Sequence, residues 1–226
     1  MTLSMQTLTK DKIKEIIAKR IAKEFKNNDI ITLGIGLPTE AANYVEDGIN
    51  VIFQSENGIV GLGKDQKGPD FNDKIINAGG VCVELNKGAS FYDSQMAFTI
   101  MRGGHIDATV LGALQVDQEG SIASWQIPGK FVPGIGGSMD LIIGSKRVIV
   151  AMTHTSKDEI KIMKKCTLPL TAYKEVDMIV TERCVFQVTD EGLVLTEINP
   201  LFTVKDIKNS TEAEFIVSNN LKEMEI

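Results

Sequence analysis

A single carboxylate is the side chain best placed for chemistry in this sequence. Glu56 follows an apolar run at residues 51–53 and is followed at once by Asn57 and Gly58. A carboxylate at the end of a strand, fixed by a turn and partly removed from water, becomes a better nucleophile or base. An acid that is fully solvated on an ordinary Asn-Gly turn would give the same residues, so both interpretations stay open at this point.

Three glycine-rich segments, residues 34–40, 54–63 and 133–140, are typical of strand ends. In open α/β sheets, ligands bind beyond the carboxyl ends of the strands, and glycines there allow backbone amides to approach a ligand closely. The third segment holds Gly136 and Gly137. Successive amides in this segment could form an anion nest or an oxyanion hole; a flexible loop is the alternative.

Two common nucleotide-binding motifs are excluded. The first glycine-rich segment begins with Gly34-Ile35-Gly36, but Thr39 stands where a dinucleotide fingerprint has its third glycine, and Pro38 interrupts the entry to the helix. The sequence contains no Gly-Lys-Ser or Gly-Lys-Thr, so a P-loop is absent.

The remaining candidate bases and nucleophiles lack partners in the sequence. His105 and His154 could each act as a general base, but neither belongs to a Ser or Cys pattern that would make a catalytic triad. A structural, hydrogen-bonding role is the simpler interpretation of each. Cys82, Cys166 and Cys184 are widely spaced and odd in number, so we expect free buried thiols in a reducing compartment and no zinc site.

Helices and strands alternate along the chain. The clearest helix is predicted over residues 9–28, where apolar side chains fall on one stripe. Further helices are expected over 39–45 with Thr39 as cap, over 93–101 with Asp93 as cap, and in the tail at 210–218. The strands are predicted at residues 30–36, 50–54, 80–85, 106–117, 146–153 and in three short segments between 176 and 198.

These elements predict an α/β fold. Most of the predicted strands are continuously apolar, which indicates burial on both faces. Strands that alternate with helices then favour an open, mainly parallel sheet flanked by helices. Antiparallel pairs are expected in the region 176–198.

The composition is that of an ordinary globular protein. The chain has 226 residues, 43% of them hydrophobic, and a net charge of −6, which we interpret as a single domain over residues 1–226. The acidic balance disfavours nucleic acid as a partner. No apolar run is long enough to span a bilayer, and the first residues show no secretory signal, so we expect a cytoplasmic protein without a membrane partner.

The segment Phe53-Gln54-Ser55-Glu56-Asn57-Gly58-Ile59-Val60-Gly61 resembles the Ser-Glu-Asn-Gly signature of the class I CoA-transferases. Other blocks of that family follow in order along nearly the whole chain, at residues 34–38, 76–79, 102–107, 111–116, 127–130, 134–140, 166–171 and 195–197. The overall pattern is most similar to the β subunits of the acetate/butyrate–acetoacetate CoA-transferases.

The resemblance implies the open α/β fold of the CoA-transferase (NagB/RpiA-like) superfamily. It also implies transfer of CoA between a short-chain acyl-CoA and a carboxylic acid, with acetate or butyrate and acetoacetate as the acids. Glu56 would match the nucleophile that carries CoA as a thioester in a ping-pong reaction. Gly137, next to Gly136, would match the glycine whose N–H stabilises the oxyanion. Contacts to CoA or substrate are expected from Thr32, Gly36, Gln54, Asn57, Gly58, Ser124 and Lys130.

A partner is implied as well. The family's other half, the α subunit, carries a Gly-Gly-Phe block that this chain lacks, so we expect an α2β2 assembly. No metal or resident cofactor is expected, since CoA is a substrate. Three alternatives stay open: CoA transfer with succinate or 3-oxoadipate as the partner acid, hydrolysis of short-chain acyl-CoA on the same scaffold, and a non-enzymatic domain that binds a sugar phosphate or senses a ligand.

Overall fold

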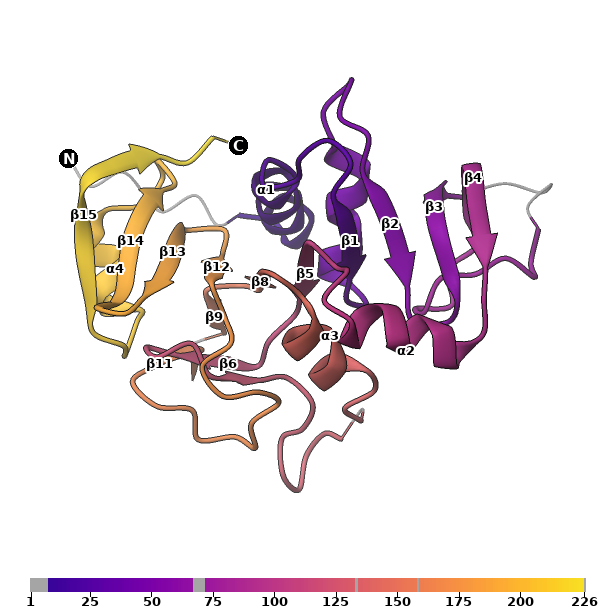
Figure 1. Cartoon of the computed structure of the whole chain (residues 1–226). Helices are drawn as coiled ribbons and strands as arrows, with labels where there is room; N and C mark the ends of the chain where they lie inside the picture. The colour runs from indigo at the N-terminus through magenta and orange to yellow at the C-terminus, as the bar shows by residue number, and fades with distance from the viewer. Residues whose placement is uncertain (1–7, 67–71, 133, 158, 226) are drawn as a thin grey trace.

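One large sheet runs through the molecule (Figure 1). The computed structural model describes residues 8–66, 72–132, 134–157 and 159–225. Residues 1–7, part of the start inspected for a secretory signal, and Pro133 of the third glycine-rich segment lie outside the described residues. The strands of the large sheet are β1 (Ile30–Leu33), β2 (Ile52–Ser55), β3 (Ile59–Asp65), β4 (Val83–Phe91), β5 (Ala108–Leu111), β8 (Val148–Ala151), β12 (Met178–Val180), β13 (Cys184–Thr189), β14 (Gly192–Ile198) and β15 (Phe215–Glu223).

The helices and two small sheets complete the fold. The helices are α1 (Lys10–Ala22), the 3₁₀ helix η1 (Leu37–Tyr44), α2 (Ser94–Arg102), α3 (Ser138–Gly144) and α4 (Val204–Asn209). The small sheets consist of β6 (Gln115–Asp117), β7 (Ile122–Ala123) and β11 (Ile162–Met163), and of β9 (Thr155–Ser156) and β10 (Glu159–Ile160).

The centre of the large sheet is parallel and buried. Its order is β15-β14-β13-β12-β8-β5-β1-β2-β3-β4, and β12, β8, β5, β1 and β2 are parallel neighbours. One core cluster packs α1 against this region, and a second packs α2 and α3 against it. The predicted α/β fold with an open, mainly parallel sheet flanked by helices is therefore confirmed. The antiparallel pairs predicted between 176 and 198 are β12–β13 and β13–β14.

Local signals determine the limits of the first helix. Thr9 accepts a hydrogen bond from the backbone N–H of Lys12 and thereby caps α1. The apolar stripe is buried, including Ile17 and Phe25. The helix ends at Ala22, earlier than the predicted 9–28, and the chain then turns into β1.

Two predictions of local structure are wrong. The tail at 210–218 is not helical, because Phe215 starts the edge strand β15, parallel to β14. Phe215 packs edge-on against Phe186 with ring centroids 5.1 Å apart, while the next residue faces outward, so the pattern has the period of a strand. The single strand predicted at 106–117 is two strands, β5 in the large sheet and β6 in a small one.

Two further elements differ from the predictions, and one strand was not predicted. The helix expected to start at Thr39 is the 3₁₀ helix η1, whose N-cap is Gly36, and the Thr39 hydroxyl donates to the Gly36 carbonyl instead. The strand predicted at 80–85 starts at Val83 and runs to Phe91. Its partner β3 was not predicted, because glycines interrupt the apolar pattern there. The Asp93 cap of α2 is confirmed by its hydrogen bond from the N–H of Met96.

A buried ion-pair cluster joins α1 to β14. The Arg20 side chain, 8% exposed, donates to both carboxylate oxygens of Glu197 at 2.6 Å and to Glu24 at 2.6 Å. Arg147 pairs with the other oxygen of Glu24 at 2.6 Å. Burial alone would raise the pKa of Glu24, but the charges of the two arginines outweigh it and hold that pKa below its usual value.

We expect Arg20→Met to lower the free energy of unfolding by about 3 kcal/mol at pH 7, because it leaves partly buried carboxylates without their partner. The lowered pKa of Glu24 means that this stabilisation is present above the unfolded-state pKa and is lost as the pH falls through the folded-state pKa. The difference from wild type should therefore shrink in acid. Urea denaturation at about pH 7 and pH 4 measures both effects.

The matched control is Lys19→Met, which removes the neighbouring exposed pair with Glu15. It should leave the urea midpoint almost unchanged, since exposed pairs are well solvated. Equal losses in the two variants would contradict a stabilising role for the buried cluster.

Candidate active site

The Glu56 turn joins β2 to β3. β2 ends at Ser55 and β3 begins at Ile59, so residues 56–58 form a tight turn between them. Gly58 has a φ of +104°, and its carbonyl accepts a hydrogen bond from the N–H of Tyr92 at 3.0 Å. A Cβ at position 58 would overlap the carbonyl oxygen of Tyr92. Both the backbone conformation and the packing therefore require glycine here.

The two neighbours of this glutamate both hold a second loop, which we call the Asn77 loop (residues 76–79). Ser55 Oγ accepts a hydrogen bond from the backbone N–H of Ala78 at 3.0 Å. Asn57 Nδ2 donates to the carbonyl oxygen of Ile76 at 2.8 Å. The nucleophile candidate is thus held between two side-chain anchors. The role expected for Asn57 was contact with CoA or substrate, whereas its amide nitrogen bonds to this loop.

The Glu56 side chain reaches the start of α3. A Cβ on Gly137 would overlap Glu56 Oε2, and the Phe98 ring of α2 lies 3.2 Å from the position of that Cβ. Burial, the larger cause, and the negative charge of Asp140 both raise the pKa of Glu56. Asp140 in turn forms an ion pair with Arg102, whose Nε lies 2.7 Å from Asp140 Oδ1. The structure therefore brings the carboxylate predicted to react directly against the glycine predicted to assist it.

The backbone at the start of α3 is suited to bind an anion. Gly136 has a φ of +52°, and Gly137 is the N-cap of the helix, where no side chain makes a capping bond. Within the described part of the chain, the N–H of Gly137 donates no hydrogen bond. A backbone amide in this position can stabilise negative charge that develops on a nearby carbonyl oxygen.

Thr32 and Gln54 form a buried pair behind the turn. They face each other in the parallel register of β1 and β2, and Thr32 Oγ1 donates to Gln54 Oε1 at 2.8 Å. Their exposed fractions are 2% and 3%, so they support the turn from inside the sheet. Gly36, exposed after β1, has a φ of +90°, a conformation that favours glycine.

Two further expected contacts lie outside this cluster. Ser124 follows β7 in the three-stranded sheet, and its hydroxyl shares a hydrogen bond of 2.7 Å with Thr171. Lys130 is exposed in a turn, where its backbone N–H donates to the carbonyl oxygen of Ile127. Among the described residues, no hydrogen bond or ion pair connects either side chain to the Glu56 turn.

The histidines and cysteines have structural environments. His154 is fully buried between the hydroxyls of Thr181 and Thr211, each 3.1 Å from a ring nitrogen. Burial lowers the pKa of His154 to about 3, so the ring is neutral. His105 is exposed. The cysteines are free, but only Cys184 is fully buried.

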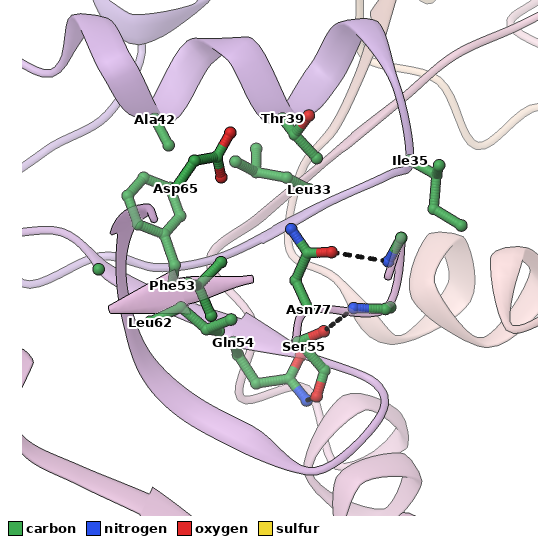
Figure 2. Close-up of a pocket in the computed structure, with 14 residues that line it drawn as sticks. Leu33, Ile35, Thr39, Ala42, Phe53, Gln54, Ser55, Leu62, Asp65 and Asn77 are labelled. Atoms are coloured by element: carbon green, nitrogen blue, oxygen red, sulfur yellow. Dashed lines mark hydrogen bonds between the residues drawn. The ribbon is translucent and has the colours of Figure 1, made fainter. Parts of the chain in front are cut away.

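A pocket opens beside the Glu56 turn, between η1, the ends of β1 to β3 and the Asn77 loop (Figure 2). It is lined by Leu33, Ile35, Thr39, Ala42, Phe53, Gln54, Ser55, Leu62, Gly63, Asp65, Asn77, Ala78, Gly79 and Val83. Sequence reasoning did not identify this pocket. The only signal was the family-like block at 76–79, to which no role had been given. Phe98 and Asp140 were missed too, because no local pattern reveals which helices approach β2.

A partly buried carboxylate thus lies against the backbone at the start of α3, an arrangement that is suited to covalent acyl transfer. The coenzyme A transferase family model matches residues 14–210. The chain belongs to the coenzyme A transferase family, as the sequence motifs predicted.

Individual relatives agree with this assignment. The β subunit of acetate CoA-transferase from Haemophilus influenzae is 51% identical over 214 residues, which cover 94% of this chain and 96% of that protein. A subunit of succinyl-CoA:3-ketoacid coenzyme A transferase from Helicobacter pylori is 43% identical and is matched over 91% of this chain and 99% of its own length. The predicted similarity to class I β subunits is thereby confirmed.

Solved structures share the fold. The acyl-CoA transferase YdiF of Escherichia coli O157:H7 superimposes with a TM-score of 0.78 at 22% identity, over all of this chain. This chain spans only 44% of the YdiF chain. Among the described residues, no helix has the length and apolar character needed to cross a membrane.

We expect Ser55→Ala to speed amide hydrogen exchange at Ala78 about tenfold, because the hydroxyl that accepts from this N–H is removed. Exchange resolved to single residues by NMR measures the effect. The matched control is Ser90→Ala on exposed β4, where exchange at Ala78 should not change. Unchanged exchange at Ala78 in the Ser55 variant would contradict the anchor.

The raised pKa of Glu56 predicts a second, pH-dependent effect. The folded state binds this proton more tightly than the unfolded state, so stability falls as the pH rises from the unfolded-state pKa through the folded-state pKa. Glu56→Gln should therefore raise the thermal midpoint at pH 7. The gain should vanish below about pH 4, where both states carry the proton.

Scanning calorimetry across this pH range measures the difference between Glu56→Gln and wild type. Glu46→Gln, which alters an exposed glutamate after η1, is the control and should give no pH-dependent gain. A Glu56→Gln protein that is less stable than wild type at pH 7 would show that the ionised carboxylate is stabilised in place.

Proposed function

We propose that this chain is the β subunit of an enzyme that moves CoA between a short-chain acyl-CoA and a carboxylic acid, through a covalent Glu56–CoA thioester. The observation that supports this most directly is the approach of the Glu56 carboxylate to the Gly137 backbone. Partial burial weakens the solvation of the carboxylate and increases its reactivity toward a thioester carbonyl.

The reaction consists of two acyl transfers and their reversal. A carboxylate oxygen of Glu56 attacks the acyl-CoA carbonyl, the C–S bond breaks, and CoA leaves as a thiolate from a mixed anhydride. The thiolate then attacks the glutamyl carbonyl of the anhydride and releases the first acid as its carboxylate. The acceptor carboxylate attacks the resulting Glu56–CoA thioester, and the same steps run backwards. No net proton is taken up or released, so the scheme has no role for His105 or His154.

Each step passes through a tetrahedral oxyanion. The Gly137 N–H is the donor that this chain offers. Gly136, with its positive φ, forms the backbone turn that leads into Gly137. A second donor would come from the Gly-Gly-Phe half of the partner. Loss of one such donor typically lowers the rate by ~10²–10³-fold, so this contribution is central to the proposal.

Water must be kept from the anhydride, and a partner subunit would do this. The elements beside Glu56 expose large apolar side chains on and next to α2 and α3, namely Phe91, Met96, Met139 and Ile143, at 61%, 50%, 51% and 65%. We infer that an α subunit covers this face in an α2β2 heterotetramer. The relatives named as subunits support a partner, and YdiF has more than this chain's length in a single polypeptide.

Acetate is supported as one acid by the name of the Haemophilus relative, and we propose butyrate and acetoacetate as the others. Succinate, named in the Helicobacter relative, or 3-oxoadipate is the alternative partner acid. Hydrolysis, with water in place of the acceptor acid, is the second alternative. The proposed reaction uses CoA as a substrate and needs no resident cofactor, and the free thiols suit the cytoplasm.

Glu56→Gln in the complex with the α subunit should lower the rate of CoA transfer from acetoacetyl-CoA to acetate by at least about 10³-fold, because the amide cannot accept CoA. Wild-type complex incubated with acetoacetyl-CoA should carry a CoA adduct on the peptide that contains Glu56. Mass spectrometry of that peptide and a coupled assay with acetate measure the two effects.

Glu46→Gln is the matched control and should retain both the adduct and the rate. A wild-type rate in Glu56→Gln would contradict the proposed nucleophile. The absence of any CoA adduct in the wild-type complex would favour a non-enzymatic role. Loss of thioester without exchange into added acetate would favour the hydrolase.

A further inference from the structure

The Asn77 side chain has a fixed orientation at the mouth of the pocket in Figure 2. Its Oδ1 accepts hydrogen bonds from the backbone N–H groups of Gly79 at 2.9 Å and Val81 at 3.1 Å. The amide nitrogen therefore points the opposite way, into the pocket on the side of Leu33 (Figure 2). Nδ2 donates no hydrogen bond to any described residue. Two backbone bonds thus hold a hydrogen-bond donor ready for a ligand.

The rest of the pocket is mainly apolar. Phe53, Leu62 and Val83 form its walls together with Leu33. Among the described residues, Asp65 is the only charged side chain that lines it, and Figure 2 shows its carboxylate near Ala42. Such a site favours an uncharged chain and disfavours a second carboxylate, which would lose water and face a like charge.

The pocket also borders the turn that carries the proposed nucleophile. Ser55 lines it and directly precedes Glu56, and adjacent Cα atoms are about 3.8 Å apart. Resting on the proposed function, we propose that this pocket binds an uncharged chain that carries a carbonyl oxygen, with Asn77 Nδ2 as the donor to that oxygen. The carbonyl belongs either to the 3-oxoacyl group of the substrate or to the pantetheine arm of CoA. If the occupant is the acyl group, the pocket disfavours a terminal carboxylate, as in a succinyl group.

The test uses the complete complex with Glu56→Gln, which cannot form the adduct, so that binding is measured without turnover. Asn77→Asp in this background keeps the oxygen that accepts from Gly79 and Val81 but removes the donor. Calorimetric dissociation constants are then compared for acetoacetyl-CoA and butyryl-CoA, which have the same number of carbons and differ in the 3-oxo group.

A rise of about tenfold in the dissociation constant for acetoacetyl-CoA alone assigns the carbonyl to the acyl group. An equal rise for both ligands assigns it to the pantetheine arm. A change below about twofold for both ligands overturns the proposal. Asp65→Asn combined with Asn77→Asp restores the charge of the pocket and should leave the loss unchanged, because the donor is still absent.

Two further variants keep the proposal testable if Asn77→Asp disturbs assembly. Ala42→Leu narrows the pocket without touching the Asn77 loop and should weaken binding of the same ligands; unchanged binding would overturn the proposal. If the acyl group occupies the pocket, Asp65→Asn alone should strengthen binding of succinyl-CoA several-fold; unchanged binding would exclude the acyl group as the occupant. If the variants do not change binding as expected, the pocket proposal fails but the proposed CoA transfer still stands. Absence of the CoA adduct in the wild-type complex contradicts the transfer itself.

Discussion

The contact between Glu56 and Gly137 depends on two places where glycine allows backbone segments to pack directly against each other. Gly58 lets the backbone at Tyr92 come so close that any Cβ would overlap it, and Tyr92 leads directly into α2. α3 packs on α2 at Gly144, where a Cβ would overlap a backbone carbonyl of α2. Both approaches require glycine, and together they hold α2 and α3 beside the Glu56 turn. The carboxylate and the Gly137 backbone therefore lie together through packing of backbone against backbone, which leaves little room for adjustment.

The sheet explains why the site lies where it does. β1 pairs with β2 on one side and with β5 on the other, so the chain order reverses there. Open α/β sheets bind ligands beyond the carboxyl ends of strands near such a reversal. The buried, apolar strands only hold the functional groups in place. The groups with chemical capacity, Glu56, Gly137 and the Asn77 amide, all lie on turns and loops that these strands hold in place.

The sequence was informative where the physics is local. The parallel core follows from continuous apolar runs, and Glu56 could be selected because a strand end and an Asn-Gly turn are both visible within a few residues. The tail was misassigned because Phe215 and Val217 share a face only at the period of a strand. Phe98 and the Asn77 loop could not be placed beside Glu56, since those contacts join separate elements through tertiary packing. The roles of Ser124 and Lys130 came from resemblance alone, and the structure adds no contact between them and the turn.

The four residues of the Ser-Glu-Asn-Gly segment have different structural roles. Burial of the carboxylate raises its pKa and costs stability at neutral pH, so the turn must be held by other contacts. Ser55 and Asn57 supply two hydrogen bonds to the Asn77 loop, and Gly58 permits the contact with Tyr92. These contacts fix the position of the turn and do not involve the Glu56 carboxylate. The same bonds hold the loop that carries Asn77, so the residues that position the proposed nucleophile also position the proposed substrate pocket.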